Sequence, residues 1–279
     1  MIKIDKIFIS NDKTKKYLLY NMDNCDAFEA VYFTRINHKE LIERVICVST
    51  QIGCQVNCKF CCTSRMGYNR NIKCEEMIET VEKIIDNNRD DNSSTTSILL
   101  TGMGEPLLNY DEVVQFYKKA NEKFDINEFI LSTSGIADKI RKIADDEIDY
   151  KLCFSLHTPF NEERSKLIPI NKKYSIEECL SSCEYYHNKT NRKISISYTL
   201  LAGINDTDEH IDELIRLLNP EYYRIQLILY NESDKMKFIR PNIQRAEEIK
   251  EKLVSNGFKV KISQGNGRDI SAACGQLFV

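Results

Sequence analysis

The fold is decided by a strand and a cysteine loop that follow each other in the chain. The strand is Arg44-Val-Ile-Cys-Val-Ser-Thr50, a largely apolar and β-branched run, and the loop contains Cys54-Gln-Val-Asn-Cys58-Lys-Phe-Cys61. In barrels of alternating strands and helices, the loops that follow the strands carry the reactive groups. A Cys-x3-Cys-x2-Cys set soon after the first such strand therefore predicts a metal centre on the reactive face of a barrel.

The three thiols favour an iron–sulfur cluster. Cysteine thiolates are the ligands of such clusters, and three of them leave one iron of a [4Fe–4S] cubane open to a substrate. The alternatives are a structural zinc site that adds Cys62 or Cys74, and a chance grouping. Structural zinc commonly uses two Cys-x2–4-Cys pairs, whereas this sequence has one group, so the cluster is preferred.

Strand patterns and helix patterns alternate after residue 43. This alternation predicts an α/β fold with a parallel sheet wound by right-handed crossovers, and six or seven units indicate an incomplete barrel. Residues 1–43 instead predict a short β-hairpin extension, from Lys16–Tyr20 and Ala27–Phe33, ahead of a core at 44–279. The expected strands are Arg44–Thr50, Thr96–Thr101, Glu128–Thr133, Tyr150–His157, Lys193–Leu201, Tyr223–Tyr230 and Lys259–Ser263. The expected helices are Glu75–Asn88, Tyr110–Lys123, Ile136–Asp145, Ile176–Lys189, Asp208–Leu218 and Pro241–Asn256, with Asp208 as an N-cap, Pro241 in a first turn and Gly257 after the last helix.

Several expected strands end in residues that suit a polar ligand. Gly104 lets a ligand approach the backbone, and the Glu105 carboxylate can hold a cationic amine. A tight turn ended by Pro106 would explain this motif alone, and a lone serine or histidine is more often a cap or a core residue. Four strand ends on one barrel face nevertheless favour a cofactor site. The other residues expected there are Ser132, Ser155, Leu156, His157 and Asn231.

The composition is that of a cytosolic globular protein rather than of a membrane, secreted or strongly basic one. The 279 residues are 42% hydrophobic and 29% charged, with a net charge of −3 and eleven cysteines. No stretch approaches the roughly 18 apolar residues of a membrane span, and the N-terminus has no signal-peptide pattern. An odd, unevenly spaced set of cysteines indicates metal or thiol chemistry in a reducing compartment. We therefore expect a cytoplasmic protein, in which any RNA contact must use a local basic patch.

A series of short motifs runs from Cys47 to Leu277. They are Cys47-Val-Ser-Thr-Gln-Ile-Gly-Cys54, Met66-Gly-Tyr-Asn-Arg-Asn71, Gly102-Met-Gly-Glu-Pro106, Leu131-Ser-Thr-Ser-Gly135, Ser155-Leu-His157, Pro169-Ile-Asn-Lys-Lys-Tyr174, Gly203-Ile-Asn-Asp206 and Asp269-Ile-Ser-Ala-Ala-Cys-Gly-Gln-Leu277. In these motifs the chain resembles the RlmN/Cfr family of radical S-adenosylmethionine (SAM) RNA methyltransferases. The resemblance implies a partial (β/α)6 barrel of the TIM type. It also implies a [4Fe–4S] cluster held by Cys54, Cys58 and Cys61, and SAM as the second cofactor, with Phe60 near its adenine.

The resemblance also implies a second use of cysteine. Cys274 would be methylated by one SAM, and a radical from a second SAM would activate that methyl group for addition to an adenine. Cys47 would resolve the protein–RNA adduct, leaving a Cys47–Cys274 disulfide that needs reduction. Glu29 resembles the family's proton acceptor, and an ordinary strand-face glutamate is the alternative. Without the resemblance, Cys47 would be interpreted as a buried cysteine of a strand, and Cys274 as a tail residue with no role.

The sequence departs from typical members of that family before Cys47. Those members carry a helical RNA-binding domain there, whereas about 46 residues precede Cys47 here. We therefore expect the barrel itself to supply the phosphate contacts, with a solvated charged face as the alternative. The expected contacts are Lys59, Arg65, Arg70, Lys73, Arg164, Lys166, Lys172, Lys173, Lys235, Lys237 and Arg240.

The leading hypothesis is an enzyme that methylates an adenosine carbon in RNA, with large-subunit rRNA as the first substrate and tRNA as the second. Pro106 after Glu105 favours C2, although Phe160–Leu167 is at least as similar to the C8-methylating branch. We expect a monomer without membrane contact that takes electrons from a donor such as flavodoxin or ferredoxin. The alternatives are a radical SAM enzyme with a different or smaller substrate, and a non-catalytic metal- or RNA-binding relative.

Overall fold

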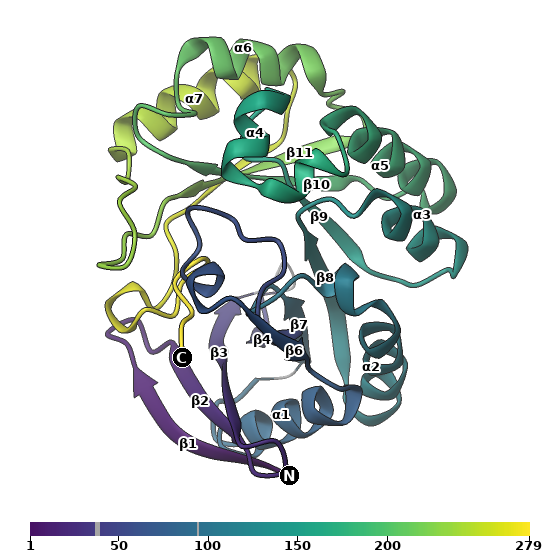
Figure 1. The fold of residues 1–279 in the computed structure, drawn as a ribbon, viewed down its shortest axis with the longest axis vertical. Helices are drawn as coiled ribbons and strands as arrows, with labels where there is room; N and C mark the ends of the chain where they lie inside the picture. Colours follow the sequence, from purple (N-terminus) through teal and green to yellow (C-terminus); the bar gives the residue numbers. More distant parts are fainter. Residues whose placement is uncertain (37–39, 94) are drawn as a thin grey trace. The chain divides into compact units, whose positions relative to one another are not determined.

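The computed structural model describes residues 1–36, 40–93 and 95–279, which form two compact units (Figure 1). The first unit contains residues 1–55, 62–132 and 266–279, and the second contains residues 56–61 and 133–265. The cysteine loop therefore contributes residues to both units. Residues 37–39, within the predicted N-terminal extension, lie outside the described residues.

The N-terminal extension forms an antiparallel layer in the first unit. β1 (Ile2–Ile9), β2 (Lys15–Asn21) and β3 (Asp26–Ile36) pair in that order, and β3 pairs with β4 (Ile42–Cys47); Figure 1 shows β1 to β3 in purple. The predicted hairpin is confirmed as β2 and β3. The sequence prediction does not include β1, because charged residues interrupt its apolar ones and leave only a short, ambiguous pattern.

β4 and two later strands of the first unit pair in parallel. β4 pairs with β7 (Thr95–Leu100), and β7 pairs with β8 (Ile126–Thr133). The helices α1 (Cys74–Asp86) and α2 (Tyr110–Lys123) pack against each other. The predicted strands and helices of this segment are present, with ends shifted by a few residues, because the apolar periods of its strands and helices differ clearly.

The second unit repeats the alternation of strand and helix. β9 (Lys151–Ser155), β10 (Ile194–Leu200), β11 (Tyr223–Leu229) and β12 (Val260–Ser263) pair in this order, and each pair is parallel. β10 is buried almost throughout, as is typical of a parallel strand covered on both faces. The helices are α3 (Ala137–Asp145), α4 (Asn161–Leu167), α5 (Ile176–Thr190), α6 (Asp208–Leu217) and α7 (Ile243–Ser255). The short α4 is missing from the sequence prediction because its seven residues are too few to show a period.

The predicted N-cap of α6 and the predicted start of α7 are wrong by one and two residues, whereas α6 begins at Asp208 as predicted. α6 is capped by the side chain of Thr207 rather than by Asp208. α7 begins at Ile243 behind the capping side chain of Asn242, so Pro241 precedes the helix. Each cap residue has an extended backbone and accepts a first-turn N–H, which is the geometry of an N-cap.

A two-stranded ribbon closes the cysteine loop. β5 (Gln51–Gly53) pairs antiparallel with β6 (Tyr68–Asn71), and the 3-10 turn η1 (Cys62–Met66) precedes β6. Gly53 has a φ of +74°, and a Cβ at this position would lie 1.8 Å from the carbonyl oxygen of Gly67. Glycine is therefore required here, and it fixes the backbone directly before the first cysteine. The remaining 3-10 turns are η2 (Pro106–Asn109), η3 (Pro169–Lys172) and η4 (Arg268–Ile270).

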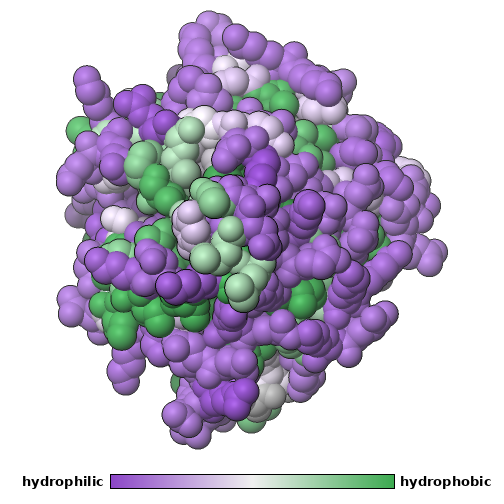
Figure 2. All heavy atoms as spheres, turned by 60° about the horizontal axis from the view of Figure 1, so that its bottom comes forward, coloured by the Kyte–Doolittle hydropathy of each residue, from purple (hydrophilic) through white to green (hydrophobic). Residues whose placement is uncertain are grey.

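The surface is mostly hydrophilic. The face drawn in Figure 2 is largely purple, with green apolar side chains gathered in smaller areas. Among the residues that the structure describes, no helix is long and apolar enough to cross a membrane.

Arg164 is a buried cation of the second unit. Its side chain has an exposed fraction of 0%, and its guanidinium donates to the carbonyl oxygens of Leu156 (3.0 Å), Ser134 (2.6 Å) and Ser155 (2.8 Å) and to Oδ1 of Asn171 (2.8 Å). These acceptors include the backbone at the end of β9. The expectation that Arg164 contacts RNA is therefore wrong, because its donors are used inside the fold.

Replacing Arg164 by methionine should destabilise the protein. We expect Arg164→Met to lower the free energy of unfolding by about 3 kcal/mol, because buried carbonyl groups lose charged donors. Urea denaturation followed by circular dichroism measures this change. Lys166→Met, two residues away and exposed, is the control and should change stability by less than about 0.5 kcal/mol. Equal stability of the two variants would contradict the structural role of Arg164.

Candidate functional site

The three loop cysteines are half-buried on irregular backbone. Cys54 lies in the first unit, where its N–H donates to the carbonyl oxygen of Gly67 at 2.9 Å. Cys58 and Cys61 lie in the second unit and are linked by a backbone hydrogen bond of 3.3 Å. Three thiols of intermediate exposure within eight residues match the donor chemistry of an iron–sulfur cluster. The described residues contain no group of three His, Cys, Asp or Glu side chains already gathered as metal ligands, so this fit rests on donor type.

The two cysteines considered as further zinc ligands are structural in character. Cys62 is buried in η1, and its N–H donates to the carbonyl oxygen of Gly275 at 2.7 Å. Cys74 is buried at the start of α1, and burial raises the pKa of its thiol to about 11. A protonated, buried thiol is a poor metal ligand, because metals bind the thiolate.

Phe60 belongs to an aromatic cluster in the second unit. Its ring meets the imidazole of His157 edge-on, with centroids 5.0 Å apart, and the ring of Phe238 with centroids 6.4 Å apart. The N–H of the preceding Lys59 donates to the carbonyl oxygen of Leu167 at 2.8 Å, which holds the loop on the end of α4. Phe238 is missing from the sequence prediction because it stands in an irregular stretch without a motif.

His157 is a neutral, oriented imidazole. Its Nδ1 accepts the N–H of Thr199 at 2.8 Å, which leaves the proton on Nε2. Burial, with the nearby charge of Arg164, lowers the pKa of His157 to about 3. Its backbone has a φ of +60°, and its carbonyl oxygen accepts from the Asn205 amide at 2.6 Å. His157, the second residue after β9, is therefore a fixed hydrogen-bond donor at neutral pH.

The remaining predicted ligand residues of the second unit lie at strand ends, as expected. Ser155 is the last residue of β9 and Leu156 follows it, and both carbonyl oxygens accept from Arg164. Asn231 follows β11 closely and is buried, with its Oδ1 3.5 Å from the Arg240 guanidinium. Arg164 thus holds the backbone of Ser155 and Leu156, and Arg240 contacts the side chain of Asn231.

Gly104, Glu105 and Ser132 lie in the first unit. Gly104 has a φ of +97°, and a Cβ there would lie 2.5 Å from the side chain of Gln51, so this position needs glycine. Glu105 is buried, and its Oε1 accepts the N–H of Leu107 at 3.1 Å, so its carboxylate caps η2. Ser132 is half-buried and is the second-to-last residue of β8. This hydrogen bond stabilises the tight turn at η2, so Glu105 has a structural role in addition to any role in binding.

Cys47 and Cys274 come together in the first unit. Cys47 ends β4, and burial, followed by the nearby Cys274 thiolate, raises the pKa of Cys47 to about 12. Cys274 is exposed. Both are thiols, because no disulfide is present among the described residues, so the disulfide implied by the family resemblance is not formed in this state. The two sulfurs are close enough for the charge of one to affect the other.

Glu29 is buried on β3, the strand beside β4. Its carboxylate lies 2.9 Å from Nζ of Lys16 and accepts the N–H of Phe278 at 2.9 Å. Burial raises the pKa of Glu29, and Lys16 and the Phe278 N–H partly offset this rise. The sequence prediction does not single out Lys16, because only the alternation of β2 turns this lysine, and not its neighbour Lys15, toward the interior.

Three of the expected RNA contacts are used inside the fold. Arg70 pairs with Asp26 and Glu76, and Arg240 donates to the carbonyl oxygens of Leu229 and Tyr230. Arg164 is buried, as described above. The prediction is wrong for Arg164, because charge alone does not show that this cation is buried; Arg70 and Arg240 are partly exposed, and RNA contact stays a prediction for them. The exposed members of the set are Lys59, Arg65, Lys73, Lys166, Lys172, Lys173, Lys235 and Lys237.

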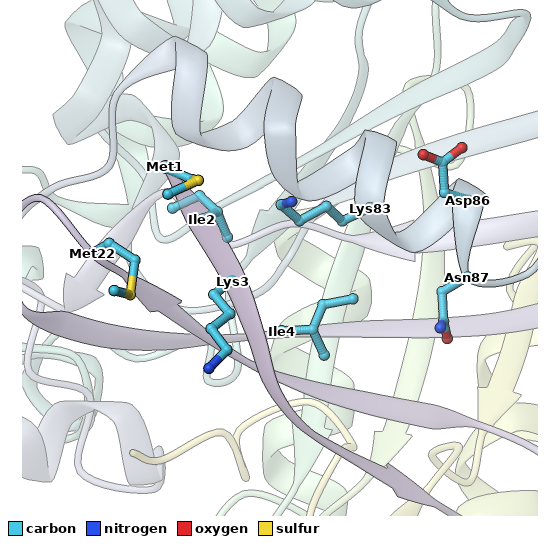
Figure 3. A pocket seen from close by; sticks show the side chains of 8 residues that line it. All are labelled: Met1, Ile2, Lys3, Ile4, Met22, Lys83, Asp86 and Asn87. Carbon is cyan, nitrogen blue, oxygen red and sulfur yellow. The ribbon is translucent and has the colours of Figure 1, made fainter.

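Two cavities are lined by residues other than those predicted to bind a cofactor. One, of about 500 Å³, lies in the first unit between β1 and α1, and Figure 3 shows its lining side chains, among them Lys3, Met22 and Asp86. The other, of about 420 Å³, lies in the second unit beside the start of α7 and is lined by Arg240 and Arg245, among others. Neither lining includes a residue predicted to bind a cofactor.

Comparison with known proteins points to one family. Residues 48–218 match the family model of the radical SAM superfamily. A probable dual-specificity RNA methyltransferase RlmN of Finegoldia magna is 37% identical over 278 residues, which are 98% of this chain and 77% of that protein. The corresponding protein of Clostridium novyi is 38% identical over 98% of this chain and 78% of its own length. The crystal structure of a radical SAM methyltransferase from Sphaerobacter thermophilus has a TM-score of 0.93 and 32% identity, covering 99% of this chain and 81% of that one. The α/β fold of the partial-barrel type expected from the sequence is confirmed.

The raised pKa of Cys47 predicts how its alkylation depends on pH. Iodoacetamide reacts with the thiolate, so in the native protein the Cys47 rate should keep rising about tenfold per pH unit beyond pH 9. In unfolded protein the rate should level off near pH 8.5, the ordinary pKa of a cysteine. Peptide mass spectrometry of anaerobic samples measures both rates, with exposed Cys25 as the internal control for the reagent. A native rate that levels off below pH 9 would contradict the burial of this thiol.

Proposed function

We propose that this chain, which belongs to the radical SAM superfamily and within it to the RlmN family, methylates a carbon atom of adenosine in RNA. The observation that carries the proposal is the pair of thiols Cys47 and Cys274, whose charges interact in the first unit. The relatives are named dual-specificity RNA methyltransferases, which supports an RNA substrate.

Members of the radical SAM superfamily use a [4Fe–4S] cluster together with SAM. Cys54, Cys58 and Cys61 would hold three irons of the cluster through their thiolates. When bound, the cluster supplies the electron that cleaves SAM reductively. Phe60 would pack near the adenine of SAM. The other residues proposed for the SAM site are Gly104, Glu105, Ser132, Ser155, Leu156, His157 and Asn231.

Covalent catalysis through sulfur suits the proposed target. Carbons C2 and C8 of adenine have no nucleophilic lone pair, so direct methyl transfer fails there, and a sulfur-linked intermediate splits the step. Exposed Cys274 would carry the methyl group. A C–H bond of this methyl group would give its hydrogen atom to the radical formed from SAM, and the methylene carbon would bond to the adenine carbon, which would lose its own hydrogen as a proton to Glu29 and one electron to an acceptor such as the oxidised cluster. The Cys47 sulfur would then attack the Cys274 sulfur. The bond from Cys274 to the carbon would break with its electron pair on the carbon, a proton taken up there would complete the methyl group, and a Cys47–Cys274 disulfide would remain.

Methylation of Cys274 would also prepare Cys47 for this attack. A thioether carries no charge, so a methylated Cys274 no longer raises the pKa of Cys47 as a Cys274 thiolate does. The thiolate of Cys47 becomes easier to form at the stage where it is needed. Exchange with small or protein thiols of the cytosol would then reduce the disulfide.

Glu29 is the proposed proton acceptor for the adenine carbon. Val31, two residues further along β3, pairs with Cys47 on β4, so Glu29 lies on the strand next to the resolving cysteine. Burial raises the pKa of its carboxyl, which makes the carboxylate a stronger base.

The proposed target is C2 of an adenosine in large-subunit rRNA, with tRNA as a second substrate. Pro106 after Glu105 supports C2, while Phe160–Leu167 keeps C8 as the alternative. A monomer that receives electrons from flavodoxin or ferredoxin in the cytosol would suffice for this reaction.

A radical SAM reaction on a smaller substrate is the second candidate function. Affinity for RNA depends mainly on phosphate contacts from lysine and arginine. Because Arg70, Arg164 and Arg240 are used inside the fold, fewer cations remain for a large RNA. SAM cleavage without RNA methylation would favour this candidate, and absence of SAM cleavage would favour a non-catalytic relative.

Removal of a loop cysteine should abolish the cluster. Anaerobic reconstitution of the wild-type protein should give a brown protein with about four irons per chain. Cys58→Ala should lose the colour and most of the iron, and Cys25→Ala, which removes an exposed thiol outside the loop, should keep both. Iron analysis and absorption spectra measure the outcome. A colourless wild-type protein that carries zinc would contradict the cluster.

Removal of Cys274 should abolish both methyl loading and RNA methylation. The reconstituted enzyme is incubated with isotope-labelled SAM and with ribosomal or transfer RNA, and mass spectrometry of the nucleosides separates C2 from C8 methylation. Cys274→Ala should form no labelled product because the methyl group has no carrier, whereas Cys47→Ala should load the methyl group and accumulate the RNA adduct. Turnover by Cys274→Ala would sink the covalent mechanism.

A further inference from the structure

The segment that carries Cys274 has little regular structure of its own. In this tail, residues 266–279, all of which are described, regular structure is limited to the short turn η4. Ordering such a segment costs conformational entropy that its own backbone hydrogen bonds do not offset. The position of Cys274 must therefore come from contacts with other parts of the first unit.

The first anchor of the tail is a reciprocal contact with the turn between β1 and β2. Asp12 accepts the N–H of Gly267 at 2.8 Å, and Asp269 accepts the N–H of Asn11 at 3.0 Å. Each segment thus supplies a carboxylate to a backbone donor of the other. This anchor fixes the tail five residues before Cys274.

The second anchor is a buried ion pair. The N–H of Phe278 donates to Oε2 of Glu29 at 2.9 Å, while Nζ of Lys16 lies 2.9 Å from Oε1 of the same carboxylate. The side chains of Lys16 and Glu29 have exposed fractions of only 9% and 3%, and the ammonium group also lies 5.0 Å from the ring centroid of Phe8. A carboxylate this deeply buried is costly unless it is paired, so Lys16 allows Glu29 to bind the tail as an anion.

Cys274 lies between these two anchors. Near it, the tail contacts η1 through the Cys62 N–H, which donates to Gly275, and through the Thr63 hydroxyl, which donates to the Leu277 carbonyl oxygen at 2.8 Å. Both anchors, however, are supplied by the N-terminal layer, β1 to β3 and their turns.

We propose that the N-terminal layer positions the tail for reaction, and that Lys16 is a positioning residue for Cys274. The inference rests on the proposed function in so far as Cys274 carries the methyl group. Lys16 acts through Glu29 and the Phe278 N–H. Without Lys16, the buried carboxylate either takes up a proton or moves toward solvent, and each change weakens a charge-assisted hydrogen bond to the tail.

Hydrogen exchange of the tail in the anaerobically reconstituted holoenzyme, without RNA, tests this proposal. Lys16→Met should accelerate exchange in peptides covering residues 272–279 by about tenfold or more, the factor expected when a hydrogen bond to a charged group is lost. Lys6→Met is the matched control, because exposed Lys6 belongs to the same layer and lies over the same Phe8 ring, at 4.7 Å. It should leave exchange of the tail unchanged. Lys16→Arg keeps the cation and should restore most of the protection.

Two further measurements separate positioning from general destabilisation. With SAM and large-subunit rRNA, Lys16→Met should lower kcat for methylation without changing KM for SAM, and Lys16→Arg should recover kcat. If Lys16→Met does not fold, the double variant Lys16→Met/Glu29→Gln replaces the buried ion pair with neutral side chains. Its glutamine oxygen still accepts the Phe278 N–H, so its tail should exchange faster than in the wild type while its strands stay protected.

Tail exchange that is equal in Lys16→Met and Lys6→Met would overturn the proposal, and so would an equal acceleration in all strands. For the double variant, tail exchange at the wild-type rate would overturn it. Failure of the wild-type enzyme to methylate any RNA would count against the proposed function alone, because exchange reports on the tail without RNA.

Discussion

A hydrogen bond of 2.7 Å from the Cys62 N–H to the Gly275 carbonyl joins two irregular segments of the first unit, on which the proposed chemistry depends. One segment is the end of the cysteine loop and the other carries Cys274. Irregular backbone exposes N–H and carbonyl groups that are costly to leave unpaired when they are buried. The loop and the tail pair such groups with each other. The Thr63 hydroxyl likewise donates to the carbonyl oxygen of Leu277, two residues further along the tail. Within the first unit, the end of the cysteine loop and the segment around Cys274 therefore order each other.

Several buried charges in the two units have partners inside their own unit. Arg164 holds the carbonyl groups at the end of β9, Lys16 compensates Glu29, and Arg35 donates to fully buried Glu43 at 2.7 Å. Each ion is costly to bury alone and is acceptable only with its partner in place. Such pairs specify one geometry more sharply than apolar packing does. They hold the backbone of the predicted ligand residues and the tail in fixed positions.

The sequence predicts structure and motifs that lie within a short stretch of chain, but it does not predict contacts between segments that are far apart in the sequence. The strands, the helices and the cysteine loop follow from apolar periods and from cysteine spacing within short windows, and the residues proposed for the SAM site were predicted from strand ends and family motifs. The contacts of Glu29 and of Asp12 with the tail could not be predicted, because they join segments at opposite ends of the sequence. Arg70 was expected at RNA for a related reason, since its partner Asp26 is far away in the sequence.

The tail also has a place in the order of folding. The contact between the Ser10 hydroxyl and the Asp269 carboxylate closes a loop of 259 positions. Closing so long a loop is entropically unfavourable until the intervening chain has folded and brought its ends together. The tail should therefore dock late in folding and detach early on local unfolding. A molecule that is only partly folded would keep Cys274 away from Cys47, so the thiol pair would form only in a chain whose fold is complete.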